Sequence, residues 1–169
     1  MSVTYRSGKP ADAAAIDRLF RASFCATFAH LYRSEDLAAF LGQFSLGGWQ
    51  SELADSAYAF EVAEQAGEIV GYAKLGPVKF PVETAGAAIL LSQLYVAPDR
   101  LGAGIGRTLM DRALAEARRL GNDQLFLTVF IDNARARSFY DGYGFEAVGR
   151  FEFMVGSQAD EDVIMRKAL

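Results

Sequence analysis

A cluster of three glycines is the part of the sequence best suited to binding an anion. The run Gly102-Ala103-Gly104-Ile105-Gly106-Arg107 stands between a strand-like segment and a helix-like segment. The first N–H groups of a helix have no intrahelical partner, and the helix dipole places partial positive charge beside them. Glycine lets phosphate oxygens approach the backbone, and the Arg107 guanidinium can add a charge-assisted contact. The run therefore predicts a site for a pyrophosphate.

Three other interpretations of a glycine cluster have to be considered. A tight turn needs glycine without any ligand. A dinucleotide-binding Rossmann domain spaces its glycines G-x-G-x-x-G, whereas this run reads G-x-G-x-G, and an antiparallel-looking hairpin precedes it. A Walker loop requires G-K-S/T, which does not follow these glycines. The strand before the run and the helix after it favour the anion site over the plain turn.

Few other side chains suit acid–base, nucleophilic or metal chemistry. His30 and Cys25 are the only histidine and the only cysteine, so one chain cannot assemble a Cys/His zinc cluster or a disulfide framework. We interpret Cys25 as a buried apolar filler and His30 as a cap or surface residue. Glu35 and Asp36 suit the first turn of a helix, with binding of a cationic amine as the alternative.

The hydrophobic pattern predicts the elements that position the glycine run. Strands are expected at 3–6, 58–63, 69–75, 88–96, 125–131, 145–155 and 163–165, and helices at 10–28, 34–42, 49–53, 105–120 and 134–140. A loop with two prolines over 76–86 could help to frame a pocket. With 51% hydrophobic residues and no linker or repeat, we expect a single domain over residues 1–169.

Charge and composition argue against several function classes. The net charge is −4 with both signs interspersed, so the basic stripe that a nucleic acid requires is missing. No apolar run approaches the roughly 20 residues of a membrane span, and polar residues follow Met1 in place of an apolar leader. We therefore expect a cytoplasmic protein with no nucleic acid, membrane or metal as a partner. Whether it forms a homodimer is left open.

Two motifs in the sequence resemble those of the GNAT superfamily of N-acetyltransferases. The segment 94–98 running into 101–106 is similar to the family's acyl-CoA signature, written Q/R-x-x-G-x-G/A, although Leu101 replaces the Gln or Arg and Arg100 lies one position early. The segment 133–145 is similar to N-x-x-A-x-x-F-Y-x-x-x-G-F. Further similarities at 27–28, at 34–37 and in the tail resemble PaiA-type polyamine acetyltransferases.

This resemblance implies a fold and a set of site residues. The fold would be α/β (α+β), the GNAT fold, with a mixed central sheet, a bulged and splayed central strand and helices on both faces. Acetyl-CoA would be the co-substrate, bound by Leu94, Tyr95, Val96, Leu101, Gly102, Ala103, Gly104, Ile105, Gly106, Arg107 and Asn133. Tyr140 would donate a proton to the departing sulfur, with packing beside Phe139 as the alternative. A phosphate contact from Arg135 or Arg137 stays open.

The resemblance also implies a reaction. We expect acetyl-CoA-dependent N-acetylation of a small primary amine, with polyamines such as spermidine and spermine favoured. Protein N-termini, amino acids or aminoglycoside-like amines are alternative acceptors, because acceptor specificity resides in variable loops such as 76–86. Several relatives place a glutamate on the central strand, whereas this strand offers only Gln93, so we assign no base. A CoA-binding sensor without catalysis is the other alternative.

Overall fold

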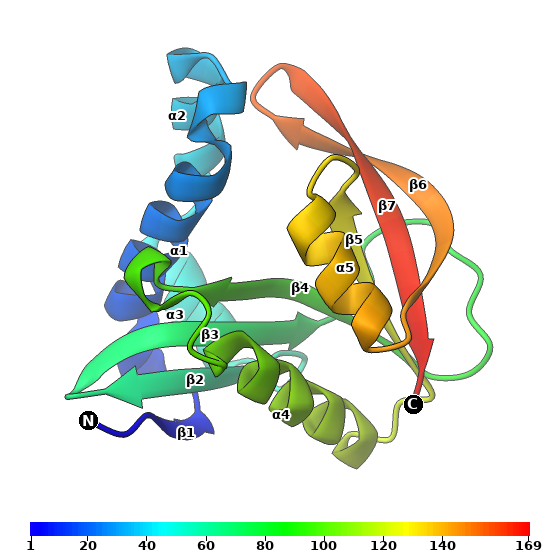
Figure 1. Ribbon diagram of the computed structural model, residues 1–169, viewed down its shortest axis with the longest axis horizontal. Coiled ribbons are helices and arrows are strands. Elements are labelled where there is room, and N and C mark those ends of the chain that lie inside the picture. The colour runs from blue at the N-terminus through cyan, green and yellow to red at the C-terminus, as the bar shows by residue number, and fades with distance from the viewer.

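The protein is organised around a seven-stranded sheet, which the computed structural model describes together with all other residues from Met1 to Leu169 (Figure 1). The strands lie in the order β1-β2-β3-β4-β5-β7-β6, and only β4 and β5 run parallel to each other. The mixed sheet that the sequence predicts is therefore confirmed. The strands are β1 (Thr4–Ser7), β2 (Ala59–Gln65), β3 (Glu68–Gly76), β4 (Ala88–Val96), β5 (Gln124–Phe130), β6 (Glu146–Val155) and β7 (Gln158–Ala168).

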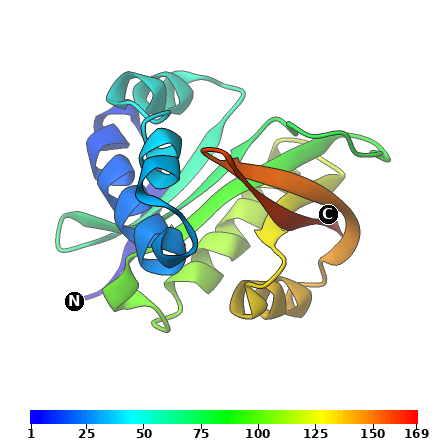
Figure 2. The same cartoon turned by 90° about the horizontal axis from the view of Figure 1, so that it is seen from above.

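Five α-helices cover the two faces of the sheet. They are α1 (Ala13–Phe28), α2 (Ser34–Leu41), α3 (Leu46–Ala54), α4 (Ile105–Arg119) and α5 (Ala134–Gly142). Figure 2 shows α1, α2 and α3, coloured blue to cyan, on one face and α4 and α5, coloured green to gold, on the other. Short 3-10 turns occur at Pro10–Asp12, Ala29–Leu31 and Pro98–Arg100. None of the helices combines the length and the hydropathy needed to cross a bilayer.

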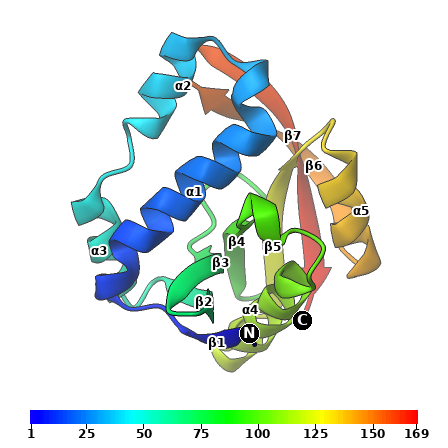
Figure 3. The same cartoon turned by 60° about the vertical axis from the view of Figure 1, so that its left-hand side comes forward.

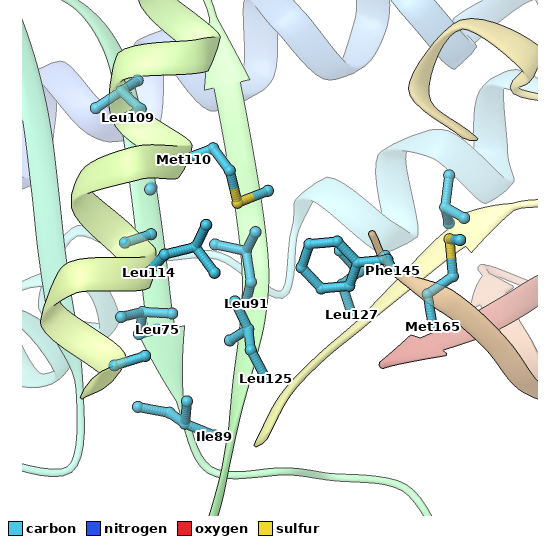
Figure 4. Close-up of a cluster of buried hydrophobic side chains, with 14 of the residues drawn as sticks. Leu75, Ile89, Leu91, Leu109, Met110, Leu114, Leu125, Leu127, Phe145 and Met165 are labelled. Carbon is cyan, nitrogen blue, oxygen red and sulfur yellow. The ribbon is translucent and has the colours of Figure 1, made fainter. Parts of the chain in front are cut away.

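The core beneath α4 fixes that helix against the sheet. Leu109, Met110 and Leu114 belong to a cluster of 18 buried residues, and Leu109 and Met110 are fully buried. Figure 4 shows Met110 and Leu114 extending from α4 towards the strand that carries Leu91. The i, i+1, i+5 spacing of Leu109, Met110 and Leu114 is the apolar face that the sequence pattern indicates. The helix that follows the glycine run is thereby held rigidly on β3 and β4.

The other face of the sheet carries an aromatic core. Phe20 on α1 lies at its centre, and its ring centroid is between 4.5 and 6.4 Å from those of Phe24, Phe40, Phe44, Trp49 and Tyr95. The buried Trp49 indole donates to Asp17 Oδ1 at 2.8 Å, so its single polar group is satisfied. This core ties α1, α2 and α3 to β4.

The centre of the sheet splits between β4 and β5. The two strands pair at three positions only, Ala88 with Gln124, Ile89 with Leu125 and Leu90 with Phe126. Beyond these positions β4 continues beside β3, and β5 continues beside β7. The register of β4 against β3 shifts between Lys74 and Leu75, which leaves Ser92 as an extra, bulged residue. The bulged and splayed central strand is confirmed.

The last strand is longer than the sequence predicts. β7 begins at Gln158 and not at Val163, because its first residues are mainly polar and acidic and hide the strand pattern. Gly156, at φ +57°, makes the turn from β6. The Asp36 carboxylate of α2 accepts from the Ser157 N–H and hydroxyl, both at 2.8 Å. Figure 3 shows α2 beside the tip of this β6–β7 hairpin.

The close approach of α4 to β3 gives a stability prediction. A Cβ at Gly71 would lie 3.0 Å from Ile105 Cγ2, 3.0 Å from Leu109 Cδ1 and 3.2 Å from Tyr95 O. Gly71→Ala should therefore lower the free energy of unfolding by about 1–3 kcal/mol, measured by urea denaturation.

Gly47→Ala is the matched control for this prediction. A Cβ at Gly47 in α3 meets no atom within 4 Å, and alanine favours a helix by up to about 1 kcal/mol over glycine. Equal stability of the Gly71 and Gly47 variants would contradict the argument that contact with α4 requires glycine on β3.

Candidate functional site

A cavity of about 510 Å³ opens where β4 and β5 separate. Its walls come from Leu91 to Val96 on β4 and from Thr128 to Phe130 on β5. The glycine run and α5 line it on the α4 side of the sheet, and Thr27 and Phe28 of α1 line it on the other side. The cavity therefore connects the two faces of the sheet through the split between the strands.

The residues singled out from the sequence are brought together around this cavity. Leu94, Tyr95 and Val96 line it from β4, and Asn133 and Tyr140 line it from α5 and the residue before that helix. The glycine run contributes Leu101, Gly102, Gly104, Ile105, Gly106 and Arg107. Ala103 does not line the cavity, and its N–H instead donates to the Arg100 carbonyl at 3.4 Å.

The glycine run has the geometry of an anion site. Gly102 and Gly104 adopt φ values of +83° and +81°, the left-handed region that favours glycine. A Cβ on either residue would meet no atom within 4 Å, so this backbone borders open space. Gly104 precedes α4 without any side chain capping the helix. The first N–H groups of α4 are therefore available to an anionic group.

Three arginines add positive charge to this end of the cavity. Arg100, Arg107 and Arg135 all contribute to its lining. Arg100 lines the cavity one position before the apolar Leu101, and its guanidinium pairs with Asp99 at 3.2 Å. Arg137 has a different role, since its side chain donates to the Ile131 carbonyl at 3.0 Å.

Tyr140 combines packing with access to the cavity. Its ring centroid is 5.5 Å from that of Phe139 and 5.8 Å from that of Phe145. Burial raises the pKa of the Tyr140 hydroxyl to about 12. The hydroxyl is therefore protonated throughout the physiological pH range and can serve as a hydrogen-bond or proton donor inside the cavity.

Gln93 and Asn133 are both oriented by hydrogen bonds. The Tyr72 hydroxyl donates to Gln93 Oε1 at 2.9 Å, and Gln93 lines the cavity. Asn133 is the N-cap of α5, because its Oδ1 accepts from the Ala136 N–H at 3.2 Å. Because the oxygen of each side-chain amide is held by a hydrogen bond, the orientation of its NH2 group is fixed as well.

Several side chains weighed from the sequence lie away from the cavity. Its walls include neither the exposed His30 nor the half-buried Cys25. Glu35 and Asp36 lie in the first turn of α2, as expected, and the Asp36 carboxylate is not free for an amine because it binds Ser157 and Arg33. The segment 76–86 does not frame the cavity either. Its apolar side chains pack against another part of the core, formed by Leu90, Phe126 and Ile164.

Two buried carboxylates near the cavity were not identified from the sequence. Asp160 and Asp162 stand two residues apart on β7, so they face the same side of the sheet. Asp162 is paired in register with Phe130, which lines the cavity. The signal available in the sequence was the run of three acidic residues, Asp160-Glu161-Asp162, directly before the apolar residues 163–165.

The chain is similar to known proteins in sequence and in fold. The model of the family described as "Acetyltransferase (GNAT) family" matches residues 14–145. An uncharacterized N-acetyltransferase in the pepI 3′ region of Lactobacillus delbrueckii subsp. lactis is 27% identical over 154 residues, which cover 88% of this chain and 87% of that protein.

Two solved structures illustrate the similarity in fold. The PaiA N-acetyltransferase of Thermoplasma acidophilum, solved in complex with coenzyme A, is 22% identical and has a TM-score of 0.81 over 100% of both chains. The ribosomal-protein-alanine N-acetyltransferase of Brucella melitensis is 27% identical and has a TM-score of 0.77, covering 98% of this chain and 99% of that chain.

The cap at the start of α5 gives a prediction for this site. Asn133→Ala removes the acceptor for the Ala136 N–H and should lower the free energy of unfolding by about 1 kcal/mol, whereas Asn133→Ser should retain most of the cap. Ser45→Ala is the matched control, because Ser45 caps α3 through the Gly48 N–H at 3.0 Å. Urea denaturation that ranks Asn133→Ser below Asn133→Ala would contradict the capping role.

Proposed function

The chain belongs to the GNAT acetyltransferase family, and from this premise we propose that it transfers the acetyl group of acetyl-CoA to a small primary amine. The observation that carries the proposal is the cavity through the sheet. A basic, glycine-rich end lies on one face, the open strand edges and Tyr140 lie in the middle, and the aromatic Phe28 and Phe130 lie towards the other face.

The basic end of the cavity fits the phosphates of acetyl-CoA. The N-terminus of α4 and the glycine backbone would hold the pyrophosphate, with Arg100, Arg107 and Arg135 as charge-assisted donors. The edge of β4 that faces β5 has no strand partner beyond Leu90. The amide groups of the pantetheine arm would pair with this edge at Leu94, Tyr95 and Val96, in the manner of an added strand.

The proposed reaction needs one proton donor for the leaving group. Acetyl-CoA supplies the thioester, whose carbonyl carbon forms a bond to the neutral amine nitrogen while the C–S bond breaks. The Tyr140 hydroxyl gives its proton to the sulfur, and the amine nitrogen, which loses a proton as the amide forms, restores the tyrosine. The reacting amine is deprotonated before attack through water, since only a small neutral fraction is needed.

Polyamines such as spermidine and spermine are the proposed acceptors. The fold similarity to the PaiA enzyme supports them, as do the aromatic Phe28 and Phe130 in the cavity wall, because aromatic faces attract ammonium groups. A protein N-terminus is the second candidate, supported by the 27% identical ribosomal-protein-alanine N-acetyltransferase. A CoA-binding sensor is the third, since β4 carries no carboxylate and Leu101 replaces the usual polar residue.

Thiol release from acetyl-CoA across an amine panel tests the proposed function. The panel contains spermidine, spermine, amino acids, aminoglycosides and peptides with an N-terminal alanine. Tyr140→Phe should lower kcat for the best acceptor by about 10²-fold, because it removes the proton donor and keeps the ring. The affinity for acetyl-CoA, measured by calorimetry, should change little.

Tyr143→Phe is the matched control for the Tyr140 variant. The Tyr143 hydroxyl bonds to Asp111 Oδ1 at 2.7 Å and to the Arg107 carbonyl at 3.0 Å, and Tyr143 does not line the cavity. A similar fall in kcat in both variants would argue against Tyr140 as the proton donor. CoA binding without thiol release for any amine would favour the sensor.

A further inference from the structure

Asp160 and Asp162 differ in how their charges are satisfied. The Asp160 carboxylate accepts a hydrogen bond from the Tyr32 hydroxyl and another from Gln158 Nε2, the latter at 2.9 Å. Asp162 is 6% exposed, and Thr128 is the side chain whose hydrogen bonding lowers its pKa. Asp162 is therefore a buried carboxylate with a single neutral partner.

No cation of the chain neutralises Asp162. Its charged neighbour is another carboxylate, Asp160. Glu161 points to the opposite face of β7 and binds the nearby Arg150 at 2.8 Å. Tyr32, Tyr95 and Tyr140 are the titratable groups on the remaining elements around this region, and all three are neutral at physiological pH. Two carboxylates thus lie close together with no cation of the chain paired with either.

Asp162 adjoins the end of the cavity that lies away from the glycine run. Thr128, its hydrogen-bond partner, and Phe130, its register partner on β5, both line the cavity. Tyr95 and Tyr140 line the same cavity, and burial, followed by the charges of Tyr140 and Asp162, raises the pKa of Tyr95. Tyr140 thus lines the cavity directly, and Asp162 adjoins it through Thr128 and Phe130 of β5.

Aromatic rings frame the two carboxylates. Asp162 lies between Phe130 on β5 and Phe151 on β6 in the register of the sheet, and Asp160 lies opposite Phe153. The Phe28 ring of α1 contacts Phe130 edge to face, with 6.4 Å between centroids. Carboxylates surrounded by aromatic rings are suited to an ammonium group, which gains both charge pairing and cation–π attraction.

We propose that Asp162, supported by Asp160, binds a second ammonium group of the acceptor, so that the preferred substrate is a di- or polyamine. The proposal rests on the proposed acetyl transfer. The nitrogen that attacks the thioester must be neutral, and an anion beside it would oppose its deprotonation. Asp162 is therefore better suited to a remote ammonium, which stays charged while the other end of the acceptor reacts near Tyr140.

The binding of the second ammonium should depend on pH. Burial is the main cause that raises the pKa of Asp162 to about 6; the charge of Asp160 contributes to the rise, and a hydrogen bond from Thr128 opposes it. Because the carboxylate must be ionised to bind a cation, KM for a diamine should rise as the pH falls below about 6. The same raised pKa means that the ionised side chain destabilises the fold at neutral pH.

A matched pair of acceptors provides the experiment. Thiol release is measured with 1,4-diaminobutane and n-butylamine, which differ only in the second amine, for the wild type and for Asp162→Asn. The ratio of kcat/KM for the diamine to that for the monoamine should fall about 10- to 100-fold in the variant, mainly through KM. The Tm at neutral pH should rise by roughly 3 to 8 °C, because a buried unpaired charge is removed.

Glu161→Gln is the matched control, since it removes one negative charge from the same strand on the opposite face. It should keep the diamine preference. Thr128→Val is a second variant, which removes the hydrogen bond that lowers the pKa of Asp162 and should shift the acid limb of the diamine profile to higher pH. An unchanged diamine-to-monoamine ratio, or a lower Tm in Asp162→Asn, would overturn the proposal.

Calorimetry separates this proposal from the proposed function. If the wild type acetylates no amine, binding of 1,4-diaminobutane to the CoA-loaded protein still tests the anchor, with Asp162→Asn as the comparison. Weaker binding in the variant supports the ammonium site although acetyl transfer has failed. Acetylation of amines with equal diamine affinity in both proteins removes the ammonium site and leaves the acetyltransferase intact.

Discussion

The short pairing of β4 with β5 is the constraint on which the rest of the site depends. Three residue pairs hold the two halves of the sheet together, and the strands then follow their outer neighbours in different directions. A continuous sheet would bury its backbone groups in ladder hydrogen bonds and leave no passage between its faces. The split instead leaves two strand edges facing a cavity, and the bulge at Ser92 changes which side chains of β4 face it.

The cavity is electrostatically polarised from one face of the sheet to the other. Arg100, Arg107, Arg135 and the start of α4 make one end positive. Asp160 and Asp162 make the region beside the other end negative. Such an arrangement favours an anionic co-substrate at one end and a cationic acceptor at the other, and it opposes the reverse orientation, because like charges in a protein interior repel strongly.

The sequence predicts the elements around the anion site well and the acidic region poorly. The glycine run and α4 follow from local rules, since glycine spacing and a 3.6-residue apolar period depend on neighbouring residues only. The motif at 133–145 marked Tyr140 because its residues lie in one short stretch of sequence. Asp162 gains its meaning from Thr128, Phe130 and Tyr95, which are distant in the chain, so no local pattern marks it. The polar start of β7 also concealed the strand that places it.

Asp162 stands out when the buried charged residues are compared. Asp12 is paired with Arg6, Asp36 with Arg33, Glu61 with Arg112, and Lys74 with Glu52, and Asp160 accepts two hydrogen bonds. Asp162 has a hydroxyl and a second carboxylate beside it, and its pKa of about 6 against an ordinary 3.8 corresponds to about 3 kcal/mol of destabilisation at neutral pH. Domains of this kind have only about 5–15 kcal/mol of stability in total. A destabilising charge of this size is understandable where a bound cation offsets it, because the ion pair then forms in a site already dehydrated and framed by aromatic rings.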